Sequence, residues 1–305
     1  MELRHHVVAV IWTFNPNIGR FARVLESIVQ QVNRVIVVDN GSGNIDQIRE
    51  TCKRFNNIIL IELGANLGVH ALNIGMSYAV KKLNSEFILL LDDDTIVYPN
   101  AVSKILSKIE NSGLYETIGV LCMSPEDVAP QQRGKLTTFL KGGQFSGCLV
   151  RAEIVKRGVR VRGEFFLDQA DFDFYDRIRK LGFMTILYGE KLIDHRIGIR
   201  LSTGIKLPLI AKSIDVYEPP WRYYYMVRNS TVLLIEGKLD IVSYIKLLSW
   251  FVIPILIVDG ILKTFKALML GIAHGLFRKL GYLDPYSIGL LSNKCRCRVF
   301  NDERR

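Results

Sequence analysis

The chain has 305 residues, of which 49% are hydrophobic and 23% are charged, and its formal net charge is +10. This apolar content excludes a disordered chain, and 24 glycines with 9 prolines exclude a collagen-like repeat. Residues 1–195 hold 23 Lys and Arg against 22 Asp and Glu, whereas residues 196–305 hold 17 against 8. The basic excess therefore belongs to the C-terminal third, whose expected neighbour is a polyanion, either nucleic acid or an anionic membrane surface.

The first hundred residues alternate between two hydrophobic periods. Continuous apolar runs, suited to strands buried on both faces, lie at residues 7–12, 34–39, 58–62 and 87–91. Apolar residues at helical spacing occupy the stretches between these runs, at residues 18–29, 46–55 and 69–83. This alternation predicts an α/β fold with a mostly parallel, Rossmann-like sheet that carries helices on both faces.

Further elements of the same kind are expected beyond Pro99. Helices are predicted at residues 101–110 and 172–181, and strands at residues 119–123, 145–150 and 184–187. From about Tyr223 the composition turns aromatic, then strongly apolar, then basic. We therefore expect one domain over residues 1–222 and a C-terminal helical segment over residues 223–305.

The C-terminal segment has the composition of a membrane-docking element. Its longest apolar run, residues 247–258, has 12 residues and contains Pro254, whereas a spanning helix needs roughly 20. Residues 262–277 interleave apolar side chains with lysines. This pattern favours helices that lie in the headgroup plane, and a marginal hairpin or a buried core helix is the alternative.

The cysteines and the N-terminus indicate a cytoplasmic location. The five cysteines are odd in number and include no C-x-x-C pair, so reduced thiols are expected. The first six residues lead directly into a predicted strand and show no secretory signal. We expect the catalytic part on the cytoplasmic side of the cell membrane, as a peripheral or monotopic protein.

Polar residues follow three of the predicted strands. The first strand ends in Thr13-Phe14-Asn15, the second in Asp39-Asn40-Gly41-Ser42, and the fourth in Asp92-Asp93-Asp94. Ligands of open α/β sheets bind beyond the carboxyl ends of the strands. Neither G-x-G-x-x-G after the first strand nor G-x-x-x-x-G-K-[ST] is present, which argues against a dinucleotide site and a P-loop.

The acidic triplet is the sharpest local signal. Three carboxylates at the end of a buried strand repel one another, so they stay ionised only beside a cation or strong donors. Alternate residues of an extended segment share a face, which places Asp92 and Asp94 together. Hard oxygen ligands in this arrangement suit Mg²⁺ or Mn²⁺. The alternatives are a solvated acidic turn and a helix N-cap.

Two further stretches are candidates for ligand contacts. Asp39 is placed to accept hydrogen bonds from a base imide or a ribose, but Asp-Asn-Gly-Ser is also a good turn in its own right. Residues 64–75 place Asn66 and Asn73 around a loop that leads into a helix, where backbone N–H groups can approach an anion. The alternative for this loop is a capping motif.

These motifs, in this order, resemble those of family 2 glycosyltransferases with the GT-A fold, and within them the rhamnosyltransferase and galactofuranosyltransferase-like branch. The N-terminal motifs that carry the resemblance are Thr13-Phe14-Asn15, VVDNGS at 37–42, N-x-G-x-x-x-x-N-x-G at 66–75 and the acidic triplet at 92–94. The later ones are FLDQADFD at 166–173, DHRIG at 194–198 and RYYYMVRN at 222–229.

The resemblance implies a role for each matching residue. Asp171 matches the catalytic base, and the neighbouring carboxyl groups of Asp168, Asp173 and Asp176 would raise its pKa toward a useful range. His195 matches a third metal ligand beside Asp92 and Asp94. The nucleotide-sugar contacts fall on residues at the ends of the strands and in the following loops: Thr13, Asn15, Asp39, Asn66, Asn73, Asp92 and Asp93.

The implied reaction is an inverting, metal-dependent sugar transfer. The donor would be a nucleoside diphosphate sugar, with dTDP-rhamnose or a UDP-sugar expected, and the transferred group a rhamnose-like or other hexose. The acceptor would be a lipid-linked or cell-surface glycan at the membrane. Nucleic acid is not an expected partner, and a homo-oligomer remains open.

Two other classes of protein compete with this interpretation. A metal-dependent nucleotidyltransferase also uses clustered aspartates, but it releases diphosphate from a nucleoside triphosphate. A non-catalytic polyanion-binding module would use the basic tail to hold nucleic acid. The apolar run at residues 247–258 is unusual for the second class.

Overall fold

The computed structural model describes residues 5–126, 129–140, 143–195, 198–200 and 216–291. Two of the five cysteines expected to be reduced, Cys295 and Cys297, lie outside the described residues. The chain forms two compact units, residues 1–163 with 171–196 and residues 164–170 with 197–305. The expected boundary at residue 222, between a catalytic domain and a C-terminal helical segment, stays a prediction.

The first unit is built on an eight-stranded sheet with the strand order β3-β2-β1-β4-β8-β6-β9-β7. These strands are β1 Val7–Thr13, β2 Arg34–Asp39, β3 Ile58–Glu62, β4 Phe87–Asp92, β6 Ile118–Ser124, β7 Leu136–Thr138, β8 Cys148–Arg151 and β9 Met184–Lys191. Neighbours β3-β2-β1-β4 are parallel, as are β6 and β9, whereas β8 and β7 pair antiparallel with their neighbours. The predicted mostly parallel α/β sheet is confirmed.

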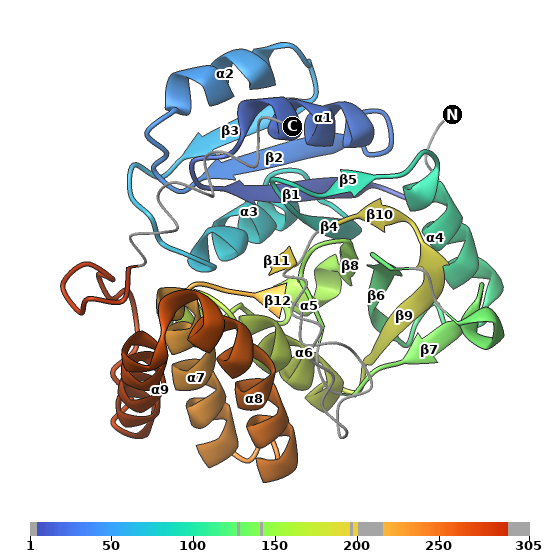
Figure 1. Cartoon of the computed structure of the whole chain (residues 1–305). Coiled ribbons are helices and arrows are strands. Elements are labelled where there is room, and N and C mark those ends of the chain that lie inside the picture. The colour runs from blue at the N-terminus through green and yellow to red at the C-terminus, as the bar shows by residue number, and fades with distance from the viewer. Residues whose placement is uncertain (1–4, 127–128, 141–142, 196–197, 201–215, 292–305) are drawn as a thin grey trace. The chain divides into compact units, whose positions relative to one another are not determined.

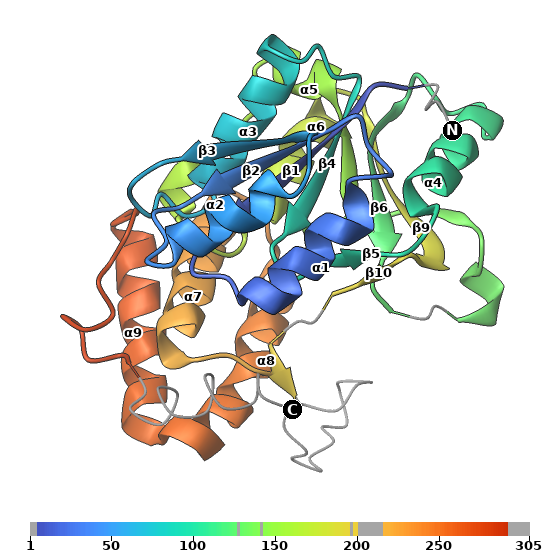
Figure 2. The same ribbon diagram turned by 90° about the horizontal axis from the view of Figure 1, so that it is seen from above.

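Helices cover both faces of this sheet, and Figure 2 shows them on opposite sides of it. One face carries α1 Ile18–Ile28, α2 Ile45–Lys53 and α4 Ala101–Asn111, whose buried side chains share one core cluster. The other face carries α3 His70–Lys81, α5 Ala152–Lys156 and α6 Ala170–Lys180. Short 3-10 turns lie at Pro130–Gln132 and Gly163–Phe165.

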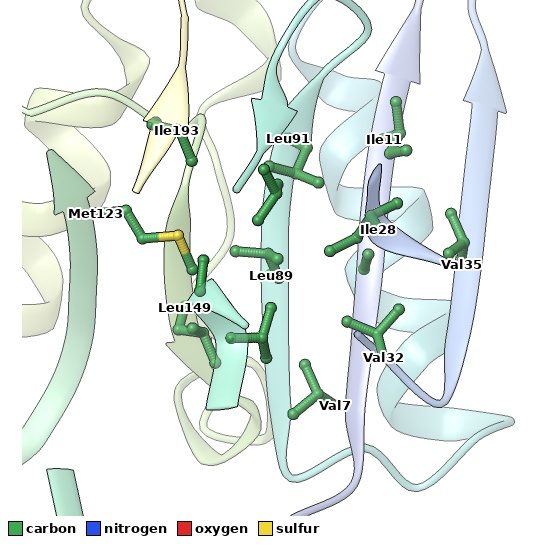
Figure 3. Close-up of a cluster of buried hydrophobic side chains, with 14 of the residues drawn as sticks. Val7, Ile11, Ile28, Val32, Val35, Leu89, Leu91, Met123, Leu149 and Ile193 are labelled. Atoms are coloured by element: carbon green, nitrogen blue, oxygen red, sulfur yellow. The ribbon is translucent and has the colours of Figure 1, made fainter. Parts of the chain in front are cut away.

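The core follows from the period of two along each strand. Val7 and Ile11 of β1 point into the cluster under α1, beside Leu89 and Leu91 of β4 (Figure 3). The intervening Val10 points to the opposite face, where a Cβ on Gly75 of α3 would lie 2.3 Å from its Cγ1. Side chains buried on both faces of β1 and β4 hold the carboxyl ends of these strands rigidly in place.

The described residues of the second unit form three helices and a short strand pair. The helices are α7 Pro220–Ile235, α8 Ile241–Asp259 and α9 Ile261–Leu276, and the strands β11 Ile199–Arg200 and β12 Val216–Tyr217 are antiparallel. Helices α7 and α9 lie side by side (Figure 1). Glycines allow this close approach, because a Cβ on Gly271 would lie 2.7 Å from the Cβ of Val227.

Helix α8 is longer than the apolar run that predicted it. It has 19 residues and continues through Pro254, so at 1.5 Å per residue it is about 28 Å long. Its best 18-residue window has a mean hydropathy of 2.2, and 17% of that window is buried. The expectation that this segment is too short to span a bilayer is therefore wrong on length, because the six residues before Leu247 are also helical.

The expectation of reduced thiols is wrong for one cysteine pair. Cys122 of β6 lies directly opposite Cys148 of β8, and the two form a disulfide with an S–S distance of 2.06 Å. Cys52 is free and buried. The spacing of the cysteines along the chain does not reveal which strands pair, so the sequence alone did not indicate this bond.

Candidate active site

The three strand ends predicted to carry function meet at one edge of the sheet. Strand β1 lies between β2 and β4, so that Thr13 is opposite Asp39 and Trp12 is opposite Asp92. Because these strands are parallel, their carboxyl ends point the same way. The polar residues that follow them therefore share one rim of the first unit.

Two residues of the acidic triplet are held by the end of β1. The indole Nε1 of Trp12 donates to Asp92 Oδ1 at 2.7 Å, and Thr13 Oγ1 donates to Asp93 Oδ2 at 2.6 Å. Burial, followed by the charges of Asp94 and Asp92, raises the pKa of Asp93 to about 7, although the bond from Thr13 opposes this. Thr13 and Asp93, both predicted nucleotide-sugar contacts, thus bind each other.

His195 lies beside Asp92 and Asp94. Its Nε2 is 3.7 Å from Asp92 Oδ2, and its Nδ1 is 3.4 Å from Asp94 Oδ1. One ligand atom from each of the three residues lies within 4.8 Å of the others. The pairing of β5 (Ile96–Val97) with β10 (Ile193–Asp194), with Asp194 opposite Ile96, brings these distant parts of the chain together.

This donor set fits a divalent cation. Two carboxylates and an imidazole are ligands that Mn²⁺ accepts, and the carboxylates suit Mg²⁺ as well. Thr95 Oγ1 lies 2.8 Å from His195 Nδ1, and it also lies 2.6 Å from Ser146 Oγ, which accepts the backbone N–H of Asp92 at 2.9 Å. A hydrogen bond to one ring nitrogen orients the other, which is the usual support for a metal-binding histidine.

Arg20 of α1 ties the two ligand segments together, and the sequence analysis missed it. Its Nε donates to the carbonyl of Asp94 at 2.7 Å, and its Nη2 donates to the carbonyl and the carboxylate of Asp194 at 3.2 and 3.0 Å. Burial alone would raise the pKa of Asp94, but the hydrogen bond and charge of His195 and the charge of Arg20 lower it. Nothing in the local sequence distinguishes Arg20 from Arg23 of the same helix.

Replacing Arg20 by Met should lower the affinity for Mn²⁺ about 10- to 100-fold, because residues that orient metal ligands contribute on that scale. The long apolar stem is kept, and only the donors to Asp94 and Asp194 are lost. Isothermal titration calorimetry measures the change. Arg49→Met is the matched control, since Arg49 of α2 pairs only with Asp46 and Glu62 among the partners described. Equal Mn²⁺ affinity in both variants would refute the assigned role.

The residues around Asp39 form a compact turn. Asp39 is 1% exposed, and its carboxylate accepts the backbone N–H groups of Gly41 and Ser42 at 3.0 and 3.1 Å. Asn15 adopts a left-handed φ of 52°, and its Oδ1 accepts the N–H of Gly43 at 2.7 Å. The turn chemistry considered as the alternative for Asp39 is therefore present, and its contact with a nucleotide stays a prediction.

Asn66 and Asn73 both form hydrogen bonds with the backbone. Asn66 Oδ1 accepts the N–H of Gly68 at 2.9 Å within its own loop. Both ends of the Asn73 amide bind Val161, with Nδ2 donating to its carbonyl and Oδ1 accepting its N–H, each at 2.8 Å. Asn73 thus joins α3 to residue 161, and direct contact of either asparagine with a sugar nucleotide stays a prediction.

Asp171 lies in the first turn of α6, and its charge acts on Tyr175 of the same helix. Burial, then the charge of Asp171 and then that of Asp92, raises the pKa of the Tyr175 hydroxyl well above its usual value. That hydroxyl donates to the carbonyl of Gln144 at 2.6 Å. The charges of the predicted base and of one predicted metal ligand therefore both act on this hydroxyl.

The carboxylates expected to raise the pKa of Asp171 are themselves neutralised. Asp173 is 0% exposed and forms ion pairs with Arg162 and Arg177. Asp168 pairs with Arg222 at 3.1 Å, and Asp176 with Lys180 at 2.8 Å. Each neighbour has a cation beside it that offsets its charge, and the expected effect on Asp171 stays a prediction.

Comparison with known proteins points to one class of enzyme. The family model described as "Glycosyl transferase family 2" matches residues 8–152. The chain is 22% identical over 262 residues to the dTDP-rhamnosyl transferase RfbF of Shigella flexneri, which covers 80% of this chain and 85% of that protein.

Solved structures share the fold. The crystal structure of S. aureus TarS 1–349 superposes with a TM-score of 0.51 at 14% identity, covering 95% of this chain and 84% of that one. The structure of GalNAc-T7 with UDP, GalNAc and Mn²⁺ has a TM-score of 0.52 at 13% identity, covering 61% of this chain and 42% of that one.

Proposed function

Because residues 8–152 form a family 2 glycosyltransferase domain and the chain is a glycosyltransferase, we propose that it moves a hexose from a nucleoside diphosphate sugar to a glycan hydroxyl with inversion. The observation that carries this proposal is the cluster of Asp92, Asp94 and His195 on the rim that also holds Asp39. Such a rim is where sheets of this kind bind nucleotides.

The donor we propose is dTDP-rhamnose or a UDP-sugar. RfbF, which aligns over 85% of its length, is named a dTDP-rhamnosyl transferase, and the GalNAc-T7 structure contains UDP with Mn²⁺. On this chain the nucleotide and sugar would contact the polar residues of the rim and its loops: Thr13, Asn15, Asp39, Asn66, Asn73, Asp92 and Asp93. The carboxylate of Asp39, already an acceptor of two N–H groups, has the chemistry to accept a base imide.

In the proposed reaction Asp171 removes the proton of the acceptor hydroxyl as its oxygen attacks the anomeric carbon. The bond from that carbon to the diphosphate oxygen breaks on the opposite side, so the configuration inverts and a nucleoside diphosphate leaves. Asp92, Asp94 and His195 would hold Mg²⁺ or Mn²⁺, which supplies positive charge beside the diphosphate as negative charge develops on it. Trp12 and Thr95 keep the ligand side chains oriented.

A panel of sugar nucleotides with and without Mn²⁺ tests this proposal. Ligands that bind only the native state raise its apparent stability, so the true donor should raise Tm only when Mn²⁺ is present. The same mixture with a glycan acceptor should release nucleoside diphosphate, seen by mass spectrometry. Release of inorganic diphosphate from a nucleoside triphosphate would instead show a nucleotidyltransferase. Salt-sensitive duplex binding without any turnover would show a polyanion-binding module.

We further propose that α8 and α9 dock the enzyme on the cytoplasmic membrane surface, where a lipid-linked acceptor would be reached. The apolar side chains exposed on these helices include Ile241, Val242, Ile245, Ile257, Ile261, Leu262, Phe265 and Met269. Lys246, Lys263 and Lys266 lie among them. Apolar surface interleaved with lysines suits a helix that lies among anionic headgroups.

Changing Leu262 to Asp should weaken binding to vesicles that contain anionic phosphatidylglycerol. Leu262 is 83% exposed, so the substitution leaves the folded unit intact while placing a charge on the docking surface. Flotation should recover at least about 10-fold less of the variant, in line with the free energy of burying one leucine. Leu140→Asp is the control, because Leu140 is 69% exposed in the first unit. Equal flotation of both variants would argue against docking through α8 and α9.

A further inference from the structure

The segment before Asp171 belongs to the other compact unit. Residues 164–170 group with residues 197–305, whereas the chain on both sides of this segment belongs to the first unit. Ala170, the last residue of this segment, is therefore bonded directly to Asp171. The backbone of this segment leads directly into α6, which begins at Ala170.

This segment has an unusual backbone conformation. Phe166, Asp168 and Gln169 have φ angles of 62°, 50° and 61°, all in the left-handed region that favours glycine. Three such residues among four consecutive positions persist only where surrounding contacts impose them. Conformations of this kind cluster at functional sites, and here they come immediately before the predicted base.

Two buried residues of α7 supply those contacts. Arg228 and Asn229 are each 0% exposed. Asn229 Nδ2 donates to the carbonyls of Leu167 at 2.5 Å, Asp168 at 2.9 Å and Phe165 at 3.1 Å. Three carbonyl oxygens of residues 165–168 therefore share the two N–H bonds of a single amide group.

Arg228 fixes that amide and adds its own bonds. Its Nε donates to Asn229 Oδ1 at 3.0 Å, and its Nη2 donates to the carbonyl of Phe165 at 2.7 Å. Its Nη1 donates to the carbonyl of Gly281 at 2.8 Å, and its guanidinium lies 4.7 Å from the ring centroid of Tyr225. These three hydrogen bonds of the buried guanidinium all go to carbonyl oxygens.

The side chain of Asp168 is held by a third residue of the same helix. Arg222 donates from Nη2 to Asp168 Oδ1 at 3.1 Å and from Nη1 to the buried Glu218 at 3.1 Å. Main chain and side chain of the turn are thus both bound to α7.

We propose that Arg228 and Asn229 are positioning residues for Asp171, because they impose the left-handed turn that delivers this carboxylate at the start of α6. This inference rests on the proposed role of Asp171 as the base. A displacement of about 1 Å at a reacting group can lower a rate roughly 100-fold, so a loosened turn has a large kinetic effect.

The test compares Asn229→Ala with Thr231→Val. Thr231 is a buried residue of the same helix whose hydroxyl bonds the Val227 carbonyl and the Tyr244 hydroxyl, away from the turn. With both proteins fully folded by near-ultraviolet circular dichroism, Asn229→Ala should lower kcat about 100-fold and leave the Mn²⁺ and donor affinities unchanged. Thr231→Val should keep the wild-type kcat and the wild-type Mn²⁺ and donor affinities. Equal kcat for the two variants would overturn the inference.

Two further variants separate this inference from general destabilisation and from the base assignment. Adding Gln169→Gly to Asn229→Ala should recover part of kcat, because glycine adopts the left-handed conformation without support. In the Asp171→Asn background, Asn229→Ala should cause no further loss, since the group it positions is already absent. Full additivity, or no recovery with glycine, would contradict the positioning role. Wild-type turnover by Asp171→Asn alone would instead refute the proposed base and leave the contacts of Asn229 unexplained.

Discussion

Replacing Asp171 by Asn should lower the rate of sugar transfer by about 10²- to 10⁴-fold, the contribution of a positioned general base. The amide keeps the size of the carboxylate but cannot accept the proton of the acceptor hydroxyl. Donor and Mn²⁺ affinities should stay within about twofold, because their proposed contacts come from the rim of the sheet and not from α6. Stopped-time assays of nucleoside diphosphate release, with calorimetry for the two affinities, measure both quantities.

Asp176→Asn is the control for this substitution. Asp176 lies on the same helix, and its described partner is Lys180. Its replacement removes the same charge and should leave kcat near the wild-type value. If the two asparagine variants retained equal activity, the base would have to be another residue. If Asp171→Asn lost donor binding along with turnover, Asp171 would be a binding residue.

Replacing Asp94 by Ala should produce a different pattern, in which metal and donor binding are lost together. Removing one carboxylate leaves Asp92 and His195, a donor set too small to hold Mn²⁺ tightly. We expect the Mn²⁺ affinity to fall by more than about 100-fold, beyond the effect of losing a residue that only orients a ligand. Donor affinity measured in Mn²⁺ should fall with it, whereas any donor binding in the absence of metal should be unaffected.

Asp46→Ala is the matched control for Asp94, since Asp46 is an exposed aspartate in the first turn of α2 that pairs with Arg49. It should leave the Mn²⁺ affinity unchanged. Tight Mn²⁺ binding by Asp94→Ala would show that the ion binds at another site. The metal role of Asp92 and His195 would then lose its support as well.

The fold could be predicted from local patterns because each strand of the first half is a short, continuous apolar run. Runs such as residues 34–39 and 87–91 are apolar on both faces, which only a covered parallel sheet satisfies. The shared position of the residues at the ends of these strands could then be predicted too, because parallel strands end at one rim of the sheet. Asp39 and Asp92 were therefore identified from order along the chain alone.

Contacts that depend on distant pairing could not be predicted in this way. His195 approaches Asp92 through the two-residue strands β5 and β10, which are too short to leave a hydrophobic period, and only the family resemblance indicated it. The Cys122–Cys148 disulfide depends on the antiparallel insertion of β8 beside β6. Nothing local distinguishes Arg20 from any other arginine on a helix.

Buried polar residues were the second feature that could not be predicted from the sequence. Residue type predicts that Arg and Asn lie at the surface, so the burial of Arg228 and Asn229 could not be expected from the sequence. They are buried because they donate hydrogen bonds to the backbone carbonyls of residues 165–168. Those carbonyls belong to a turn with left-handed residues, which helix and strand propensities do not predict. Proteins depart from such local rules mainly at functional or strained sites, and residues 165–169 are a departure of this kind.

A crystal structure of the protein with Mn²⁺ and a nucleoside diphosphate tests the central claim most directly. Anomalous scattering should place the ion in contact with Asp92, Asp94 and His195, and the carboxylate of Asp171 should lie within about 10 Å of it, the span that one hexose can bridge to a catalytic base. An anomalous peak away from these three residues, or an Asp171 carboxylate well beyond that distance, would contradict the account.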